Sequence, residues 1–217
     1  MLGKKIVIVI LIFLIVIMAL KIKFQSNENF SNKELKFIHI TKNAGTFIED
    51  IAKRKNILFG RFHGEYGYWH HFFPNVDENI KNKYDWFMVV RNPYDRIISE
   101  YYCNWNGVGD TIHNKKEFNK YIINKINNRS TVGDHYSEQY KYLDDNHKIH
   151  IIKYENLNNE LYSLFKQYNL DIDLSNEKIN KPKNIKKFTP RDFDENVIGL
   201  INNVYHNDFE KFGYTKM

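Results

Sequence analysis

The chain has 217 residues, a formal net charge of +6 and a sequence pI near 9.1. A single cysteine, Cys103, excludes an intrachain disulfide, and no histidine or cysteine spacing has the pattern of a zinc site, so we expect no metal. The basic balance suits an anionic partner such as a nucleotide or a sulfated glycan, and the length favours one α/β domain.

The N-terminal segment is apolar without interruption from Ile6 to Leu20 and is flanked by lysines. This run is shorter than the roughly 20 residues that a bilayer core requires, but lysine side chains can extend to the interface. A cleaved signal peptide would want small residues at a cleavage site, and a buried core helix is rarely apolar on every face. We therefore predict a membrane anchor over residues 1–23, a stem over 24–35 and a folded domain over 36–217. Most of the mass follows the anchor, which favours a lumenal or external domain, although lysines on both sides leave the orientation open.

Three short apolar runs predict strands, at residues 36–40, 86–90 and 149–153. Apolar residues at helical spacing, with the expected start signals, predict helices at residues 47–54, 77–83, 93–102, 115–127, 137–143, 158–168 and 194–205. Residues 60–74 are rich in glycine, histidine and aromatics and predict an ordered loop. The alternation of strands and helices predicts a single three-layer α/β domain with a central parallel sheet flanked by helices.

A polar turn follows the first predicted strand and reads Lys42-Asn43-Ala44-Gly45-Thr46. Ligands of a parallel sheet bind beyond the carboxyl ends of the strands, where helix N-termini offer N–H groups to anions. Gly45 would let the backbone approach a phosphate, while Lys42 supplies charge and Thr46 a hydroxyl. In the common P-loop the lysine follows the second glycine, so the order found here disfavours a kinase or ATPase. The alternative is an ordinary turn with a surface lysine.

A second turn follows the strand predicted at residues 86–90 and carries Arg91, with Ser99 eight residues later. A guanidinium at this place can bind a phosphate with two hydrogen bonds, and Ser99 lies about two turns into the next helix. The alternative is a local ion pair between Arg91 and Asp95. Together the two turns predict a ligand that carries two separate phosphates.

These segments resemble a known family. Residues 37–46, FIHITKNAGT, are similar to the 5′-phosphosulfate loop of sulfotransferases, and residues 89–101, VVRNPYDRIISEY, are similar to their 3′-phosphate motif. Residues 134–139 with 152–157, and the ending 205–214, resemble the carbohydrate, Golgi-type branch. Thr41 stands where that family often has proline, and Ala44 where it often has glycine.

The resemblance implies the P-loop-like sulfotransferase fold, a Golgi-type lumenal or equivalent location, and transfer of a sulfuryl group from 3′-phosphoadenosine 5′-phosphosulfate to a hydroxyl. The acceptor would be a glycan or another hydroxyl-bearing molecule, and neither a metal nor nucleic acid is implied. Lys42 would contact the leaving oxygen, and Arg91 and Ser99 would hold the 3′-phosphate. The remaining donor-binding residues that the resemblance implies are Asn43, Ala44, Gly45, Thr46 and Phe47.

An acceptor hydroxyl also needs a general base, for which histidine suits neutral pH. The candidates between the two phosphate motifs are His63, Glu65, His70 and His71. We favour His70, with His71 close behind, because relatives often carry a Trp-His pair near this point; a packed loop histidine is the alternative.

Further along the chain, His135 and Gln139 would serve the donor or the acceptor, unless they only form a solvated helix end. The basic stretch 181–187 would close over the nucleotide or form a solvated loop.

Two other functions compete with sulfuryl transfer. A nucleotide-dependent kinase is disfavoured by the order of the first turn and by the lack of an acidic magnesium-binding motif. A non-catalytic, membrane-tethered binding module is disfavoured because Lys42, Arg91, Ser99 and the histidines are all retained. The oligomeric state stays open.

Overall fold

The computed structural model describes residues 33–103, 107, 111–112, 114–172, 174 and 187–217. Residues Lys33–Met217 form one compact unit. The predicted anchor, most of the predicted stem and the basic stretch 181–186 lie outside the described residues. Within the described part of the chain, no helix is both long and apolar enough to cross a membrane.

Three strands form a parallel sheet in the order β1-β2-β3, with β1 at Leu35–Ile38, β2 at Asp85–Val90 and β3 at Ile149–Lys153. Phe37 pairs with Phe87 across the first ladder. Every residue of β2 after Asp85 is buried, as expected for the central strand of a sheet covered on both faces. The predicted parallel α/β architecture is therefore confirmed.

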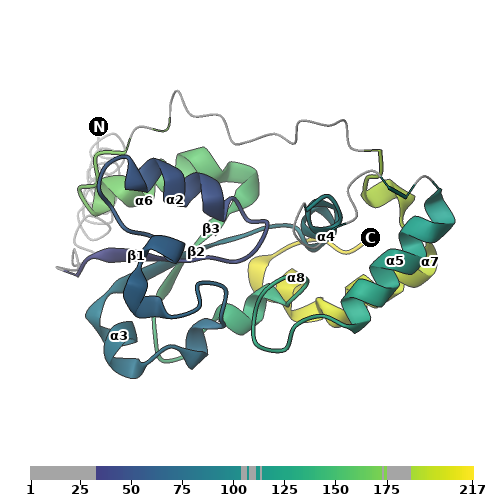
Figure 1. Ribbon diagram of the computed structural model, residues 1–217, viewed down its shortest axis with the longest axis horizontal. Helices are drawn as coiled ribbons and strands as arrows, with labels where there is room; N and C mark the ends of the chain where they lie inside the picture. Colours follow the sequence, from purple (N-terminus) through teal and green to yellow (C-terminus); the bar gives the residue numbers. More distant parts are fainter. Residues whose placement is uncertain (1–32, 104–106, 108–110, 113, 173, 175–186) are drawn as a thin grey trace, which may run out of the picture. The chain divides into compact units, whose positions relative to one another are not determined.

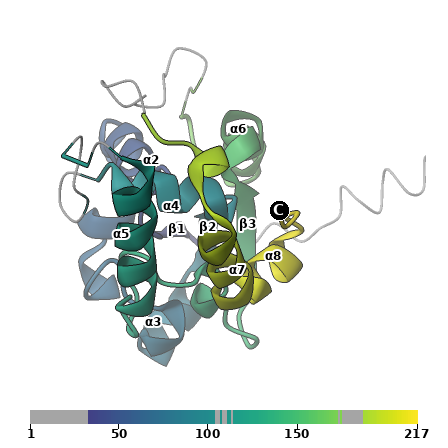
Figure 2. The same cartoon turned by 90° about the vertical axis from the view of Figure 1, so that its right-hand side faces the viewer.

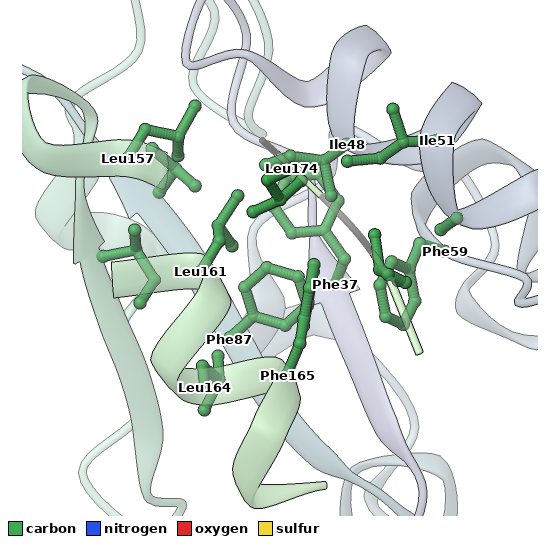
Figure 3. Close-up of a cluster of buried hydrophobic side chains, with 14 of the residues drawn as sticks. Phe37, Ile48, Ile51, Phe59, Phe87, Leu157, Leu161, Leu164, Phe165 and Leu174 are labelled. Carbon is green, nitrogen blue, oxygen red and sulfur yellow. The ribbon is translucent and has the colours of Figure 1, made fainter. Parts of the chain in front are cut away.

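Helices flank this sheet on its two faces (Figure 1). α2 (Gly45–Lys53) and α6 (Leu157–Gln167) lie side by side over one face, and α3 (Glu78–Lys83) lies toward the other. The view turned by 90° shows the same arrangement, with the strands in the order β1, β2, β3 (Figure 2). Side chains from α2, α6 and the strands interdigitate between the layers; those labelled in Figure 3 include Phe37, Ile48, Phe87, Leu161 and Phe165.

A second group of helices lies beyond the ends of the strands, on the side where α4 leaves β2 (Figure 1). It comprises α4 (Pro93–Tyr101), α5 (Lys115–Asn127), α7 (Glu195–Val204) and α8 (His206–Phe212). Phe118 and Ile122 of α5 pack with Val197 and Ile201 of α7 in a buried cluster. Apolar residues at helical spacing put these side chains on one face of each helix.

The structure differs from the sequence predictions at residues 137–143, at α8 and within the predicted loop at residues 60–74. Residues 137–143 form only a short 3₁₀ helix, η4 (Gln139–Tyr142), and α8 was not predicted. The predicted loop contains the 3₁₀ turns η1 (Gly60–Phe62), η2 (Gly64–Tyr66) and η3 (Phe73–Asn75). Cys103 lies past the end of α4 and is buried.

Candidate active site

The two turns predicted to bind anions lie side by side at the carboxyl ends of β1 and β2. The Arg91 guanidinium donates from Nη1 to the carbonyl oxygen of Lys42 at 3.2 Å. Asn43, which is fully buried, donates from Nδ2 to the carbonyl of Val89 at 2.7 Å. The two turns lie together because adjacent parallel strands bring both to one edge of the sheet.

Gln139 connects these two turns to the C-terminal helix. Its Oε1 accepts from Asn43 Nδ2 at 2.7 Å and from the backbone N–H of Arg91 at 2.9 Å. Its Nε2 donates to the carbonyl of Arg91 at 2.8 Å and to Asp208 of α8 at 3.3 Å. Gln139 is completely buried, so its side chain joins parts of the site rather than presenting an amide to a ligand.

The first turn has an unusual backbone. Lys42 and Ala44 have φ values of 63° and 64°, in the left-handed region that favours glycine, which accounts for the glycine common in the family at the second position. Ala44 is the N-cap of α2 and provides no side-chain hydrogen bond. Among the described residues, neither the Lys42 ammonium nor the exposed Thr46 hydroxyl has a hydrogen-bond or ion-pair partner. The charge and the free N–H groups at the start of α2 are thus available to an anion.

Gly45 is required by packing within the protein. A Cβ at this position would lie 2.0 Å from Nε2 of His39. The glycine therefore makes room for an imidazole, and its predicted contact with a phosphate stays a prediction. Phe47, also among the predicted donor-binding residues, turns its side chain into the core beneath α2, so only its backbone is available to a ligand.

The second turn also has groups without partners. No ion pair joins Arg91 to Asp95, both of which the structure describes, so that alternative is wrong. The Arg91 guanidinium instead lies 4.1 Å from the ring centroid of Tyr154, and its buried Nε has no partner. Ser99, half-buried on α4, has a hydroxyl without a partner among the described residues.

The first turn of α4 is already occupied by protein groups. The Asn92 side chain accepts from the N–H of Tyr94 at 3.0 Å, and Glu155 accepts from the N–H of Asn92 at 2.9 Å. The N–H groups of Asn92 and Tyr94 are therefore not available to an anion near this helix, whereas the side chains of Arg91 and Ser99 are.

His70 has the geometry of a general base. Its Nδ1 lies 3.0 Å from Oδ1 of Asp134, and its buried Nε2 has no partner in the described structure. A proton on Nδ1 that is shared with the carboxylate leaves the Nε2 lone pair free to take a proton. The ring of Trp69 packs against that of His70 with centroids 3.7 Å apart.

Asp134 holds this histidine under backbone strain. Its φ is 109°, a conformation that residues other than glycine rarely adopt and that is concentrated at functional sites. Its other oxygen accepts from the Tyr68 hydroxyl at 3.2 Å. Burial raises the pKa of Asp134, but the hydrogen bond from His70 and the charges of His135 and His70 outweigh it, so the pKa is lowered overall. Asp134 is therefore ionised at neutral pH.

The other predicted base candidates lie in different surroundings. His71 is half-buried and pairs with Gly133 through an isolated antiparallel bridge, with its ring edge-on to Tyr68. His63 packs on Trp86 and Tyr84, near the start of β2, where burial lowers its pKa to about 4. Glu65 is exposed beside it and binds Lys83 and Tyr84. His63 and Glu65 are thus at the amino end of the sheet, away from the two turns.

A buried polar cluster supports the site from below. Arg96 donates to the Thr41 carbonyl at 3.0 Å and to the Ser137 carbonyl at 2.6 Å. Glu100 accepts from the Thr41 hydroxyl at 2.7 Å and lies 2.5 Å from Nδ1 of His135. His135 is therefore tied to Glu100 and is no solvated helix end.

The same cluster has one arrangement that could hold a metal ion. Ligand atoms of Glu100, Cys103 and His135 lie within 4.8 Å of one another. The hydrogen bond between His135 and Glu100 accounts for the closeness of these two residues, and Thr41 also donates to Glu100. Burial raises the pKa of Glu100, but its hydrogen bond with His135 and the charge of Arg96 outweigh it and lower the pKa overall.

Sequence reasoning missed several residues of the site. His39 and Glu49 form a buried pair beside Gly45, and Asp134 and Arg96 were not singled out. The spacing of His39 and Glu49, ten residues apart across a turn, has no periodic signature. Asp134 directly follows Gly133, and this is the signal that could have indicated an unusual backbone there.

Comparison with known proteins adds a finding that covers most of the chain. The family model described as "Sulfotransferase family" matches residues 17–215, a span that includes both turns, His70, Asp134 and η4. No curated protein and no solved structure matches the chain.

Proposed function

The chain belongs to the sulfotransferase family, and we propose that it transfers a sulfuryl group from 3′-phosphoadenosine 5′-phosphosulfate to a hydroxyl of a carbohydrate. The observation that carries this proposal is the meeting of three features at one edge of the sheet. The Lys42 turn and the Arg91 turn are joined at 3.2 Å, and the His70–Asp134 pair adjoins the first turn through His39. Two anion sites and a base are the groups that this reaction requires.

The donor fits the residues that are present. Lys42, Thr46 and Ser99 have polar groups without partners among the described residues, and the buried Nε of Arg91 has none. We assign the 5′-phosphate to Lys42 and to the backbone N–H groups of Asn43, Ala44, Gly45, Thr46 and Phe47. We assign the 3′-phosphate to Arg91 and Ser99. The donor supplies the sulfuryl group and leaves as adenosine 3′,5′-bisphosphate.

The protein residues then have separate roles. His70 takes the proton of the acceptor hydroxyl on Nε2 as that oxygen bonds to sulfur, and Asp134 stabilises the resulting imidazolium through Nδ1. Lys42 neutralises the charge that grows on the departing phosphate oxygen. His71 stays the second candidate for the base, because its half-buried ring adjoins Tyr68. Its side chain lacks the carboxylate partner that His70 has.

The direct test is calorimetry of the protein with adenosine 3′,5′-bisphosphate. We expect binding that Arg91→Ala weakens by roughly ten- to a hundredfold, because a charge-assisted hydrogen bond is worth about 1.5–3 kcal/mol. Asp95→Ala, an exposed neighbour on α4, is the matched control and should bind normally. Failure of the wild-type protein to bind the bisphosphate, or binding of ATP with magnesium instead, would contradict the proposal.

Activity is tested with radiolabelled donor and a panel of glycans. Lys42→Ala and His70→Ala should abolish transfer while leaving the fold intact. Asp134→Asn should lower kcat by about 10²-fold or more, because it withdraws support from the base. If His71→Ala is inactive and His70→Ala is active, the base is His71. Bisphosphate binding without transfer to any glycan would favour a binding module or another acceptor.

We also propose that residues 1–23 anchor the protein to a membrane, with the domain on the lumenal or external side. The apolar run from Ile6 to Leu20 and the flanking lysines support this assignment. Extraction of membranes at alkaline pH tests it, since an anchored protein stays with the lipid. Release of the full-length chain would rule out the anchor.

A further inference from the structure

His39 directly follows β1 and its imidazole is buried. Its Nδ1 lies 2.7 Å from Oε1 of Glu49, a fully buried carboxylate on α2. Glu49 is fixed in turn, since it accepts from the backbone N–H of Arg61 at 2.9 Å and pairs with the Arg61 guanidinium at 3.3 Å. The imidazole therefore has one position, set by α2.

This imidazole touches both halves of the proposed site. On one side it fills the space above Gly45, where a Cβ would lie 2.0 Å from Nε2 and 2.3 Å from Cδ2. On the other side its ring meets the rings of Trp69 and His70 edge-on, with centroids 4.7 Å and 4.8 Å away. A single side chain thus separates the first turn of α2 from the base.

The protonation state of His39 favours a role in packing over a role in proton transfer. Burial lowers its pKa, in opposition to the hydrogen bond and charge of Glu49, which raise it, while the charges of His70 and Arg61 lower it further. A neutral imidazole does not repel the imidazolium that forms on His70 during transfer. Its remaining role is mechanical contact with Gly45 and His70.

We propose that His39 is a positioning residue that fixes the distance between the donor-binding turn and the base His70. The proposal rests on the proposed function for its role in transfer, but the contact itself needs no ligand. In-line transfer requires the acceptor oxygen, which the base holds, to face the sulfur held by the turn. A displacement of about 1 Å between the two can cost as much as 10²-fold in rate.

The first test uses Gly45→Ala as a steric push on His39. With ¹⁵N-labelled histidine in the full-length protein, Gly45→Ala should move the His70 ring signals through His39, whose ring supplies the three atoms nearest to a Cβ at residue 45. In the double variant His39→Ala/Gly45→Ala, the added methyl should no longer affect His70 relative to His39→Ala alone. Unmoved His70 signals in Gly45→Ala would overturn the proposal, as would an equal shift in the presence and absence of His39.

The second test separates binding from turnover. His39→Ala should bind adenosine 3′,5′-bisphosphate within threefold of wild type, because Lys42, Arg91 and Ser99 remain, whereas kcat with an active glycan falls at least tenfold. His39→Gln keeps a donor for Glu49 and should fold and recover part of kcat if the alanine variant is unstable. Lys55→Ala, at an exposed position just past the end of α2, is the matched control and should leave kcat unchanged, because Lys55 pairs with exposed Asp171 and not with Arg61 or Glu49.

The pH profile distinguishes positioning from base catalysis. The acid limb of kcat/KM should persist in His39→Ala at a lower plateau; its loss would make His39 the base and overturn the proposal. If the wild-type protein fails to bind the bisphosphate, the proposed function is wrong. The response of the His70 signals to Gly45→Ala still tests whether His39 transmits a displacement from residue 45 to His70.

Discussion

Gln139→Leu removes the amide that joins both turns to α8 while keeping a side chain of similar size. The amide makes hydrogen bonds with Asn43 Nδ2, with the backbone N–H and carbonyl of Arg91, and with Asp208. Leucine can make none of them. Because the site is completely buried, water cannot replace the lost partners.

The expected loss follows from the groups left without partners. The N–H of Arg91 and one N–H of the Asn43 amide lose their acceptor, and an unsatisfied buried donor costs about 1–3 kcal/mol. The variant should therefore lose about 2–6 kcal/mol of unfolding free energy. For a domain of this size each kcal/mol corresponds to about 2–4 °C, so Tm should fall by roughly 5–20 °C.

Scanning calorimetry with and without adenosine 3′,5′-bisphosphate measures both consequences. Gln139→Leu should unfold earlier and bind more weakly, because the Asn43 side chain and the Arg91 backbone lose the partner that they share. Gln167→Leu, the same change at the exposed end of α6, is the control and should behave as wild type. A Gln139→Leu protein within about 1 kcal/mol of this control would refute the assigned role.

Two further predictions concern stability. Burial raises the pKa of Asp208 from 3.8 to about 6, against hydrogen bonds from Gln139 and Tyr140, so the folded state binds more protons than the unfolded state between those values. Stability should therefore fall by up to about 3 kcal/mol as pH rises from about 4 to above 6, and urea unfolding across this range should show a flatter profile for Asp208→Asn. Leu161→Ala should lower the free energy of unfolding by about 2–5 kcal/mol in the same assay, because Leu161 is on the fully buried face of α6. Tyr162→Ala, at an exposed position of the same helix, should lower it little. Equal losses at both positions would contradict the packing shown in Figure 3.

The sheet and most helices were predictable because their signals are local. The strand at residues 149–153 and the helix at 115–127 have the predicted bounds, since an isoleucine-rich segment marks the strand and an Asn114 cap marks the helix. The helix predicted at residues 137–143 was wrong because tertiary contacts determine the conformation of this segment. Asp208 of α8 accepts from the backbone N–H groups of Gln139 and Tyr140, a contact between residues 68 and 69 positions apart that no local signal in the segment indicates.

The donor side of the site was predictable because both turns are continuous in sequence. The buried residues that hold these turns in place were not predictable. Arg96 and Glu100 are four residues apart and have the pattern of an exposed helical pair. The structure buries both, and only the packing of α4 against the first turn reveals it. Likewise, Asp134 is 64 residues from His70, and no sequence period relates them.

The burial of Arg96 and Glu100 has a consequence for how the protein should respond to ionic strength. At 0.1 M salt, dissolved ions largely screen the attraction between exposed charges that are more than about 10 Å apart, but they do not enter a packed interior. Lys42 and Arg91 are only half-buried, whereas Arg96 and Glu100 are shielded from solvent. Added salt should therefore weaken capture of a highly charged nucleotide while leaving the framework that holds the turns unchanged, so a salt-dependent activity would report on encounter rather than on unfolding.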